Sequence, residues 1–142
     1  MEPRVNVITL GVDEIGRARK FYEDLGFKAS SASNEHITAF QLGPIVLCLY
    51  PTKLLAEDAK VKQDPERKGF RGVTLAYNVA TKEEVQQVLE KAEKVGGKVL
   101  KKAQDVFWGG HSGYFADLDG HVWEVAWNPF WPLQNGVVQL PQ

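Results

Sequence analysis

The sequence of 142 residues contains a single cysteine, Cys48, which excludes an intramolecular disulfide. Because Cys48 lies within an apolar run, we expect a buried, unreactive thiol and a reducing compartment, the cytoplasm. An excess of charge is missing too: the formal net charge is −1, so no basic footprint for nucleic acid is present. The longest apolar run, Ile45–Tyr50, is far shorter than the roughly 20 residues of a membrane-spanning helix. We therefore expect neither a nucleic-acid partner nor a membrane partner, and polar residues in Met1–Asn6 argue against a secretory leader.

Apolar residues make up 44% of the chain, which is enough for one globular core. In the first half, apolar residues recur at helical spacing between Ile15 and Leu25, and Gly26 is a helix stop. Four segments of this half have the composition of strands: Val5–Val12, Phe27–Ser33, Ile37–Leu42 and Ile45–Tyr50. The predicted order is β-α-β-β-β.

The same order returns in the second half. Thr81 and Glu84 form a capping-box pattern that opens a helix, and Gly96-Gly97 ends it. The predicted strands around this helix are Val73–Val79, Lys98–Lys102, Gly113–Asp117 and His121–Trp127. An internal repeat of this kind changes the fold prediction, because two such units can place their sheets side by side.

The predicted fold is therefore α+β: two βαβββ repeats that form curved mixed sheets around a cup, with the helices on the convex side. We expect one domain over residues 1–142, with repeats at about 5–52 and 71–127. The connection at 53–70 is polar and includes a short helix near Lys53–Lys60, and an aromatic and proline-containing tail occupies 128–142. Phe130 and Trp131 in the tail predict an apolar contact and favour a homodimer.

The second repeat closes with a hairpin over Gly113–Asn128, signalled by Asp119-Gly120 between two apolar runs. Glu124 lies in the middle of its last strand, where a lone charge needs a partner, a cavity or a proton. Strand alternation places Glu124 on one face, and Trp123 and Trp127 on the other. We expect the aromatic face to pack under a helix and the Glu124 face to look into the cup.

Two segments resemble the vicinal oxygen chelate superfamily, which includes glyoxalase I, extradiol dioxygenases and bleomycin-resistance proteins. One runs from Leu10-Gly11-Val12 through Ala18-Arg19-Lys20-Phe21-Tyr22 to Leu25-Gly26-Phe27, and the other is Phe115–Val125. The resemblance covers roughly 5–128 and implies the fold more specifically than any activity.

The resemblance also implies where a metal would bind, because metal-using members place ligands on the first and last strand of each repeat. These positions correspond to Val7, Thr74, the Ile45–Tyr50 strand and Glu124, and only Glu124 carries a usual ligand. One carboxylate does not make a site for a divalent ion. We therefore expect no cofactor, with a divalent metal disfavoured.

Further candidates lie near the hairpin. Trp108 and His111 belong to a glycine-rich loop that leads into it, and Tyr114 follows on the next strand. These side chains could line the cup beside Glu124. The alternative is that Trp108 packs on the core and His111 is a solvated loop residue.

Two functions follow from these patterns. The first is a metal-independent protein that binds a small organic ligand in a cup near Glu124, with Trp108, His111, Tyr114, Thr74 and Val7 as lining residues. The second is a glyoxalase-like lyase or isomerase, metal-dependent, with Glu124 as ligand or as general base. A third reading is structural: Glu124 is held by Thr74 or by a tyrosine and meets no ligand.

Overall fold

The structure is a computed structural model that describes residues 1–66 and 68–142. Arg67, which falls in the predicted connection, lies outside the described residues. The chain divides into two compact units, Met1–Phe70 and Arg71–Gln142, and each contains its own sheet. The division falls at the end of the predicted connection.

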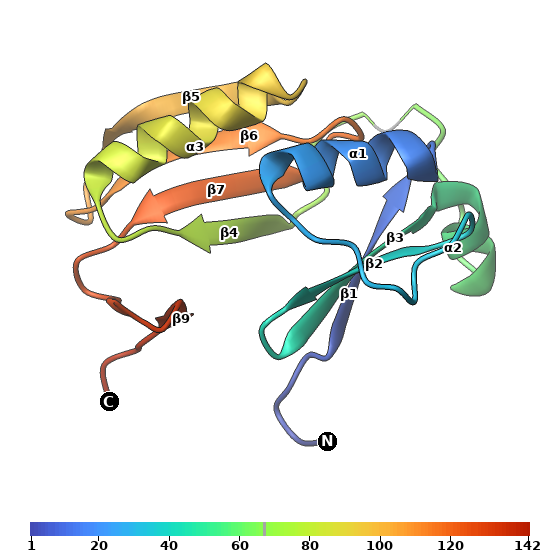
Figure 1. Cartoon of the computed structure of the whole chain (residues 1–142), viewed down its shortest axis with the longest axis horizontal. Coiled ribbons are helices and arrows are strands. Elements are labelled where there is room, and N and C mark those ends of the chain that lie inside the picture. The colour runs from blue at the N-terminus through green and yellow to red at the C-terminus, as the bar shows by residue number, and fades with distance from the viewer. Residues whose placement is uncertain (67) are drawn as a thin grey trace. The chain divides into compact units, whose positions relative to one another are not determined.

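The first unit contains a three-stranded mixed sheet with the order β1-β3-β2 (Figure 1). Its elements are β1 (Val7–Val12), α1 (Ile15–Leu25), β2 (Thr38–Leu42), β3 (Ile45–Pro51) and α2 (Thr52–Asp58). β1 pairs with β3 in parallel, and β2 pairs with β3 antiparallel. Helix α1 buries Phe21 and Tyr22, and the Tyr22 ring lies 5.8 Å from that of Phe40 in β2.

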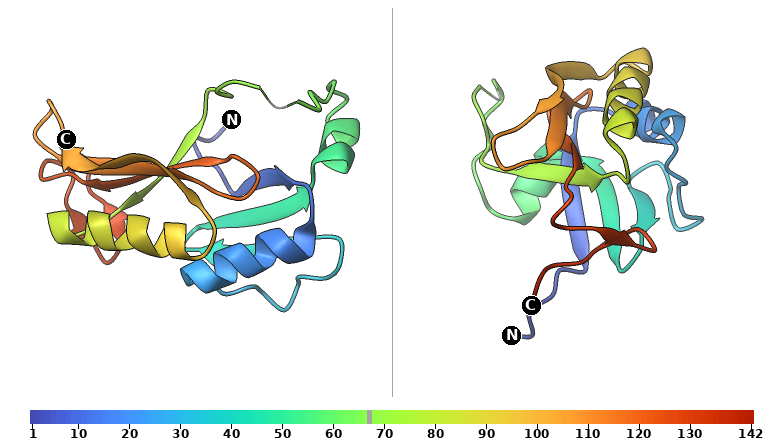
Figure 2. Two further views of the ribbon diagram at one scale, coloured as in Figure 1. Left: turned by 90° about the horizontal axis from the view of Figure 1, so that it is seen from above. Right: turned by 90° about the vertical axis from the view of Figure 1, so that its left-hand side faces the viewer.

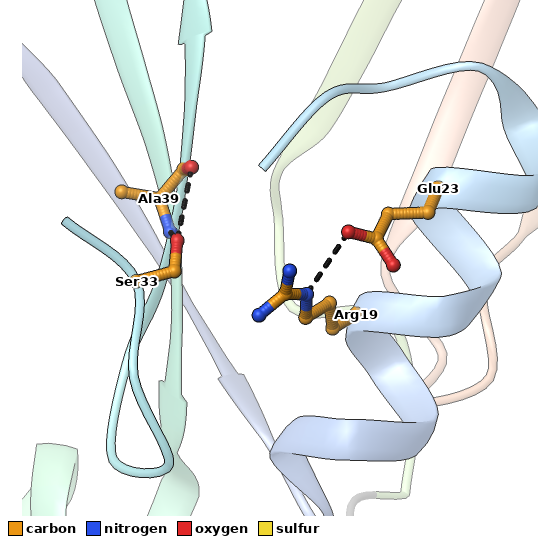
Figure 3. Close-up of polar contacts among 4 residues, drawn as sticks. All are labelled: Arg19, Glu23, Ser33 and Ala39. Carbon is orange, nitrogen blue, oxygen red and sulfur yellow. Dashed lines mark hydrogen bonds and ion pairs between the residues drawn. The ribbon is translucent and has the colours of Figure 1, made fainter. Parts of the chain in front are cut away.

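The strand expected over Phe27–Ser33 is wrong in extent, because only an isolated bridge between Ala29 and Phe40 forms there. Serine side chains explain the difference, since they offer the backbone alternatives to a strand ladder. The Ser30 hydroxyl accepts the Ala32 N–H, and the Ser33 hydroxyl accepts the Ala39 N–H at 3.0 Å (Figure 3). The segment is thus held to β2 both by the Ser33 side chain and by a backbone hydrogen bond of 2.8 Å from the Ser30 N–H to the Ala39 carbonyl. Figure 3 also shows the Arg19–Glu23 ion pair along α1, at 3.0 Å.

The second unit contains a four-stranded mixed sheet with the order β4-β7-β6-β5. Its elements are β4 (Thr74–Asn78), α3 (Lys82–Lys94), β5 (Lys98–Asp105), β6 (His111–Ala116), β7 (Val122–Trp127), β8 (Leu133–Gln134) and β9 (Val137–Val138). As in the first unit, the first strand pairs in parallel with the last large strand, here β4 with β7. The α+β class and the internal repeat are therefore confirmed.

Helix α3 begins as the sequence predicts. The Thr81 hydroxyl accepts the Glu84 N–H, and the Glu84 carboxylate accepts the Thr81 N–H. The helix lies along one face of the sheet, and no helix covers the other face within residues 71–142 (Figure 2). Gly113 in β6 permits the close approach, because a Cβ there would lie 2.4 Å from Leu89 Cδ1. The sheet therefore has a helix face and a face that carries no helix of this unit, which we call the open face.

The tail forms the short antiparallel hairpin β8–β9. Leu133, Gly136 and Val138 of the tail line a pocket of about 550 Å³ together with β4 and the start of α3. Phe130 and Trp131 remain 63% and 45% exposed, so the expected apolar docking of these rings is only partial within their unit. In the part of the chain that the structure describes, no helix is both long and apolar enough to cross a membrane.

Candidate functional site

Glu124 occupies an interior strand of the second sheet. In the register of the sheet it lies beside Ala76 of β4 and Tyr114 of β6. Its neighbours Trp123 and Val125 are buried on the helix face, where Trp123 stacks on Phe115 with parallel rings. Alternation along β7 therefore places Glu124 on the open face, half-buried, as the sequence pattern predicts.

Tyr114 is the partner that the lone carboxylate required. Its hydroxyl donates a hydrogen bond of 3.0 Å to Glu124 Oε2. Burial, this hydrogen bond and the charge of Glu124 raise the pKa of Tyr114 above its ordinary value. The phenol consequently stays protonated around neutral pH and acts as a donor to the carboxylate.

Lys101 extends this pair into a row across the sheet. It lies opposite Tyr114 in the register of β5 and β6, and its Nζ is 5.6 Å from the centre of the Tyr114 ring. Ala76, Glu124, Tyr114 and Lys101 thus contribute one residue from each strand. We call this set the cross-strand row.

Sequence reasoning missed Lys101 because regular alternation assigns it to the wrong face. Val99 pairs with Phe115 on the helix face, and a residue two positions later should share that face. The register shifts between Val99 and Lys101, so Lys101 rather than Leu100 lies opposite Tyr114. A bulge of this kind redirects side chains, and no residue type in the strand signals it.

His111 was a candidate for lining the cup beside Glu124, with a solvated loop position as the alternative, and the structure does not bring it together with Glu124. It begins strand β6 instead of lying in a loop, and it shares the helix face with Gly113 and Phe115. Its Nδ1 lies 2.9 Å from Asp105 Oδ1, and Lys82 Nζ of α3 lies 3.0 Å from the same oxygen. Hydrogen bonds from Lys82 and His111 lower the pKa of Asp105. His111 therefore belongs to a polar cluster on the far side of the sheet from Glu124.

The other predicted site residues lie in three different settings. Trp108 covers Gly110, because a Cβ on Gly110 would lie 1.9 Å from the Trp108 ring. Thr74 pairs with Val122 and lies on the open face with Glu124. Of the two partners considered for Glu124, Thr74 or a tyrosine, it is Tyr114 that donates the hydrogen bond. Val7 belongs to the first unit, where it pairs with Val46 and is 52% exposed.

The side chains around Glu124 do not fit a divalent metal. Such an ion requires several oxygen, nitrogen or sulfur donors. Glu124 has a protonated phenol on one side and Ala76 on the other. Across residues 1–66 and 68–142, no three His, Cys, Asp or Glu side chains gather into a group that could hold an ion. The row is better suited to a hydrogen-bonded organic ligand.

Comparison with known proteins agrees with this arrangement of elements. The sequence model of the Glyoxalase/Bleomycin resistance protein/Dioxygenase superfamily matches residues 4–125. A glyoxalase-related enzyme from Fulvimarina pelagi is 35% identical, with 99% of each chain covered and a TM-score of 0.88. A hypothetical protein from S. aureus is 26% identical over 90% of this chain and 95% of that one, with a TM-score of 0.76.

A more distant structure shares the fold alone. Lactoylglutathione lyase from Agrobacterium tumefaciens is 20% identical, covers 94% of this chain and all of its own, and has a TM-score of 0.67. The comparison with curated proteins finds no match.

Proposed function

Because the chain belongs to the glyoxalase/bleomycin resistance protein/dioxygenase superfamily, we propose that it binds a small organic ligand on the open face of its second sheet, without a metal. The observation that carries this proposal is the hydrogen-bonded pair of Tyr114 and Glu124 within the cross-strand row. The pair offers a carboxylate with unused acceptor capacity on a face that no helix of residues 71–142 covers. A small number of placed polar groups beside apolar side chains is typical of small-molecule sites.

The acceptor capacity of Glu124 indicates which part of the ligand it meets. Tyr114 uses one position on Oε2, and an ionised carboxylate has about four acceptor positions in all. A cationic or N–H-bearing group of the ligand would therefore be held at Glu124. Val122, which is half-buried and shares its face, supplies apolar contact area beside it.

Binding can be tested by isothermal titration with bleomycin and a panel of planar cationic and neutral aromatic compounds. We expect Glu124→Gln to weaken binding of the cationic hits about tenfold or more, because a charged hydrogen bond contributes roughly 1.5–3 kcal/mol. His111→Gln is the matched control, since its side chain lies on the helix face, and it should bind like the wild type. Equal affinities for wild type and Glu124→Gln would remove Glu124 from the site.

The second candidate function is a lyase or isomerase in which Glu124 is a metal ligand or removes a proton next to a carbonyl. It is favoured by the 35% identity to a protein described as a glyoxalase-related enzyme. Mass spectrometry tests it by following lactoylglutathione formed from methylglyoxal and glutathione in the presence of the protein, with and without Mn²⁺, Ni²⁺, Zn²⁺, Co²⁺ or Fe²⁺. Turnover that disappears in Glu124→Ala would favour the enzyme over the binding protein. Metal content of the purified protein, compared between wild type and Glu124→Ala, tests the metal-free part of our proposal separately.

A further inference from the structure

Lys101 is half-buried, and none of the described residues places a carboxylate within ion-pair distance of its ammonium group. Its Nζ lies over the Tyr114 ring, and the structure records no ion pair for it among residues 1–66 and 68–142. An ammonium group placed on an aromatic face gains a cation–π interaction but keeps N–H donors free for another partner.

A second lysine in the same unit shows what is missing at Lys101. Lys82 Nζ lies 5.3 Å from the centre of the Trp127 ring, and it also contacts Asp105 Oδ1 at 3.0 Å. On the helix face the protein therefore completes the lysine–aromatic pair with its own carboxylate. On the open face the equivalent carboxylate is not supplied by the described residues.

The register fixes how far apart the backbones of Lys101 and Glu124 lie. Tyr114 separates the two residues, so their backbones are two inter-strand spacings apart, about 10 Å. Within the cross-strand row, Glu124 and Lys101 have opposite charge. A ligand that contacts both residues must carry a hydrogen-bond donor at Glu124 and an anion at Lys101.

We propose that Lys101 binds a carboxylate of the ligand and that the ligand is an elongated organic acid whose N–H-bearing group meets Glu124. A carboxylate fits better than a phosphate monoester, since one ammonium neutralises one charge and a phosphate carries about −1.5 to −2 at neutral pH. The negative charge of a phosphate that Lys101 leaves unneutralised would lie on the same face as the negative Glu124, and the two would repel each other. This inference rests on the proposed function, because it assigns the ligand class of that site.

The test uses 4′-aminobiphenyl-4-carboxylate and its methyl ester, which differ in charge at one end and share the amine at the other. Titrations followed by NMR chemical shifts of the full chain give both affinities. We expect the wild type to bind the acid about tenfold more tightly than the ester. Lys101→Met keeps the apolar stem and removes the charge, so it should bind the ester as before and lose the preference for the acid.

Lys102→Met is the matched control, because Lys102 is the adjacent, exposed lysine of the same strand, and it should keep the preference. An acid preference that survives in Lys101→Met would overturn the proposal. If the wild type binds acid and ester equally and Glu124→Gln weakens both, the proposed function stands and the role of Lys101 falls. Failure of the wild type to bind either compound would count against both.

Discussion

Tyr114 holds its proton more tightly than a tyrosine in water, and its surroundings explain why. Burial disfavours the phenolate, and Glu124 accepts the phenol's hydrogen bond while repelling a negative charge on it. The folded-state pKa therefore lies above the unfolded value of about 10. By linkage, the stability contributed by this proton is fully present below pH 10 and is lost as the pH rises through the higher, folded-state pKa.

The titration of Tyr114 alone is the phenolate absorbance of the wild type minus that of Tyr114→Phe, measured against pH. We expect its midpoint to lie above pH 10. Glu124→Gln should lower this midpoint without restoring the ordinary value, because burial remains. A midpoint that Glu124→Gln leaves unchanged would show that the hydrogen bond does not form in solution.

Thr38 presents the opposite case, a polar group without a partner. It is fully buried in β2, and its hydroxyl has no hydrogen-bond partner among the described residues. An unsatisfied buried hydroxyl costs about 1–3 kcal/mol, and valine has nearly the same shape. We expect Thr38→Val to raise the free energy of unfolding by about 1 kcal/mol.

Urea denaturation measures this gain. Thr9→Val, an exposed threonine of β1, is the control and should stay within about 0.5 kcal/mol of wild type. A destabilised Thr38→Val would mean that the hydroxyl finds a partner in solution.

Among the elements, α3 depends on side chains at its first turn. Glu84 Oε2 accepts the N–H groups of both Ala80 and Thr81, and the Thr81 hydroxyl accepts the Glu84 N–H. We expect Thr81→Ala to lower the free energy of unfolding by about 1 kcal/mol, because the Glu84 N–H loses its partner. Thermal unfolding of Thr81→Ser, which keeps the hydroxyl, should match the wild type. Equal losses in both variants would assign the effect to the methyl group instead of the cap.

Local chemistry decided which elements could be predicted from the sequence. The capping box and Gly26 at the end of α1 are short-range signals, and both formed as predicted. The strand over Phe27–Ser33 failed because Ser30 and Ser33 bond the backbone directly. A propensity pattern cannot weigh that competition, since it depends on where β2 lies.

The same distinction applies to the candidate site. Alternation along β7 correctly placed Glu124 opposite the aromatic face, because the strand is regular. Lys101 was missed and His111 was associated with Glu124, because bulges in β5 and the true start of β6 are set by strand pairing. Which face a side chain occupies depends on such register shifts, and a sequence period does not contain them.

At the scale of the whole molecule, each unit has a buried core of its own and contains a different residue type whose signal can report its unfolding. All four tryptophans, Trp108, Trp123, Trp127 and Trp131, lie in the second unit. Cys48, the single cysteine, is 8% exposed in the first unit, and burial raises the pKa of its thiol. A low thiolate fraction and poor access make its labelling slow until the unit opens.

We expect a core mutation to act mainly on its own unit. Leu10→Ala in β1 removes a buried side chain at a cost of about 2–5 kcal/mol, so it should accelerate Cys48 labelling more than it shifts the tryptophan fluorescence transition in urea. Leu89→Ala in α3 is the matched variant and should do the reverse. Equal shifts of both reporters in both variants would show that the units open as one.

The parallel pairing of first and last large strands also sets an order on biosynthesis. Val7 pairs with Val46, 39 positions later (46 − 7), and Thr74 pairs with Val122, 48 positions later (122 − 74). Since a ribosome adds roughly 5–20 residues per second, β4 leaves it seconds before β7 exists. During that interval the apolar Leu75 and Tyr77 of β4 have no β7 beside them, whereas the first unit has already received all its strands. Both units therefore leave their first strand unpaired during synthesis, and the second unit does so for slightly longer.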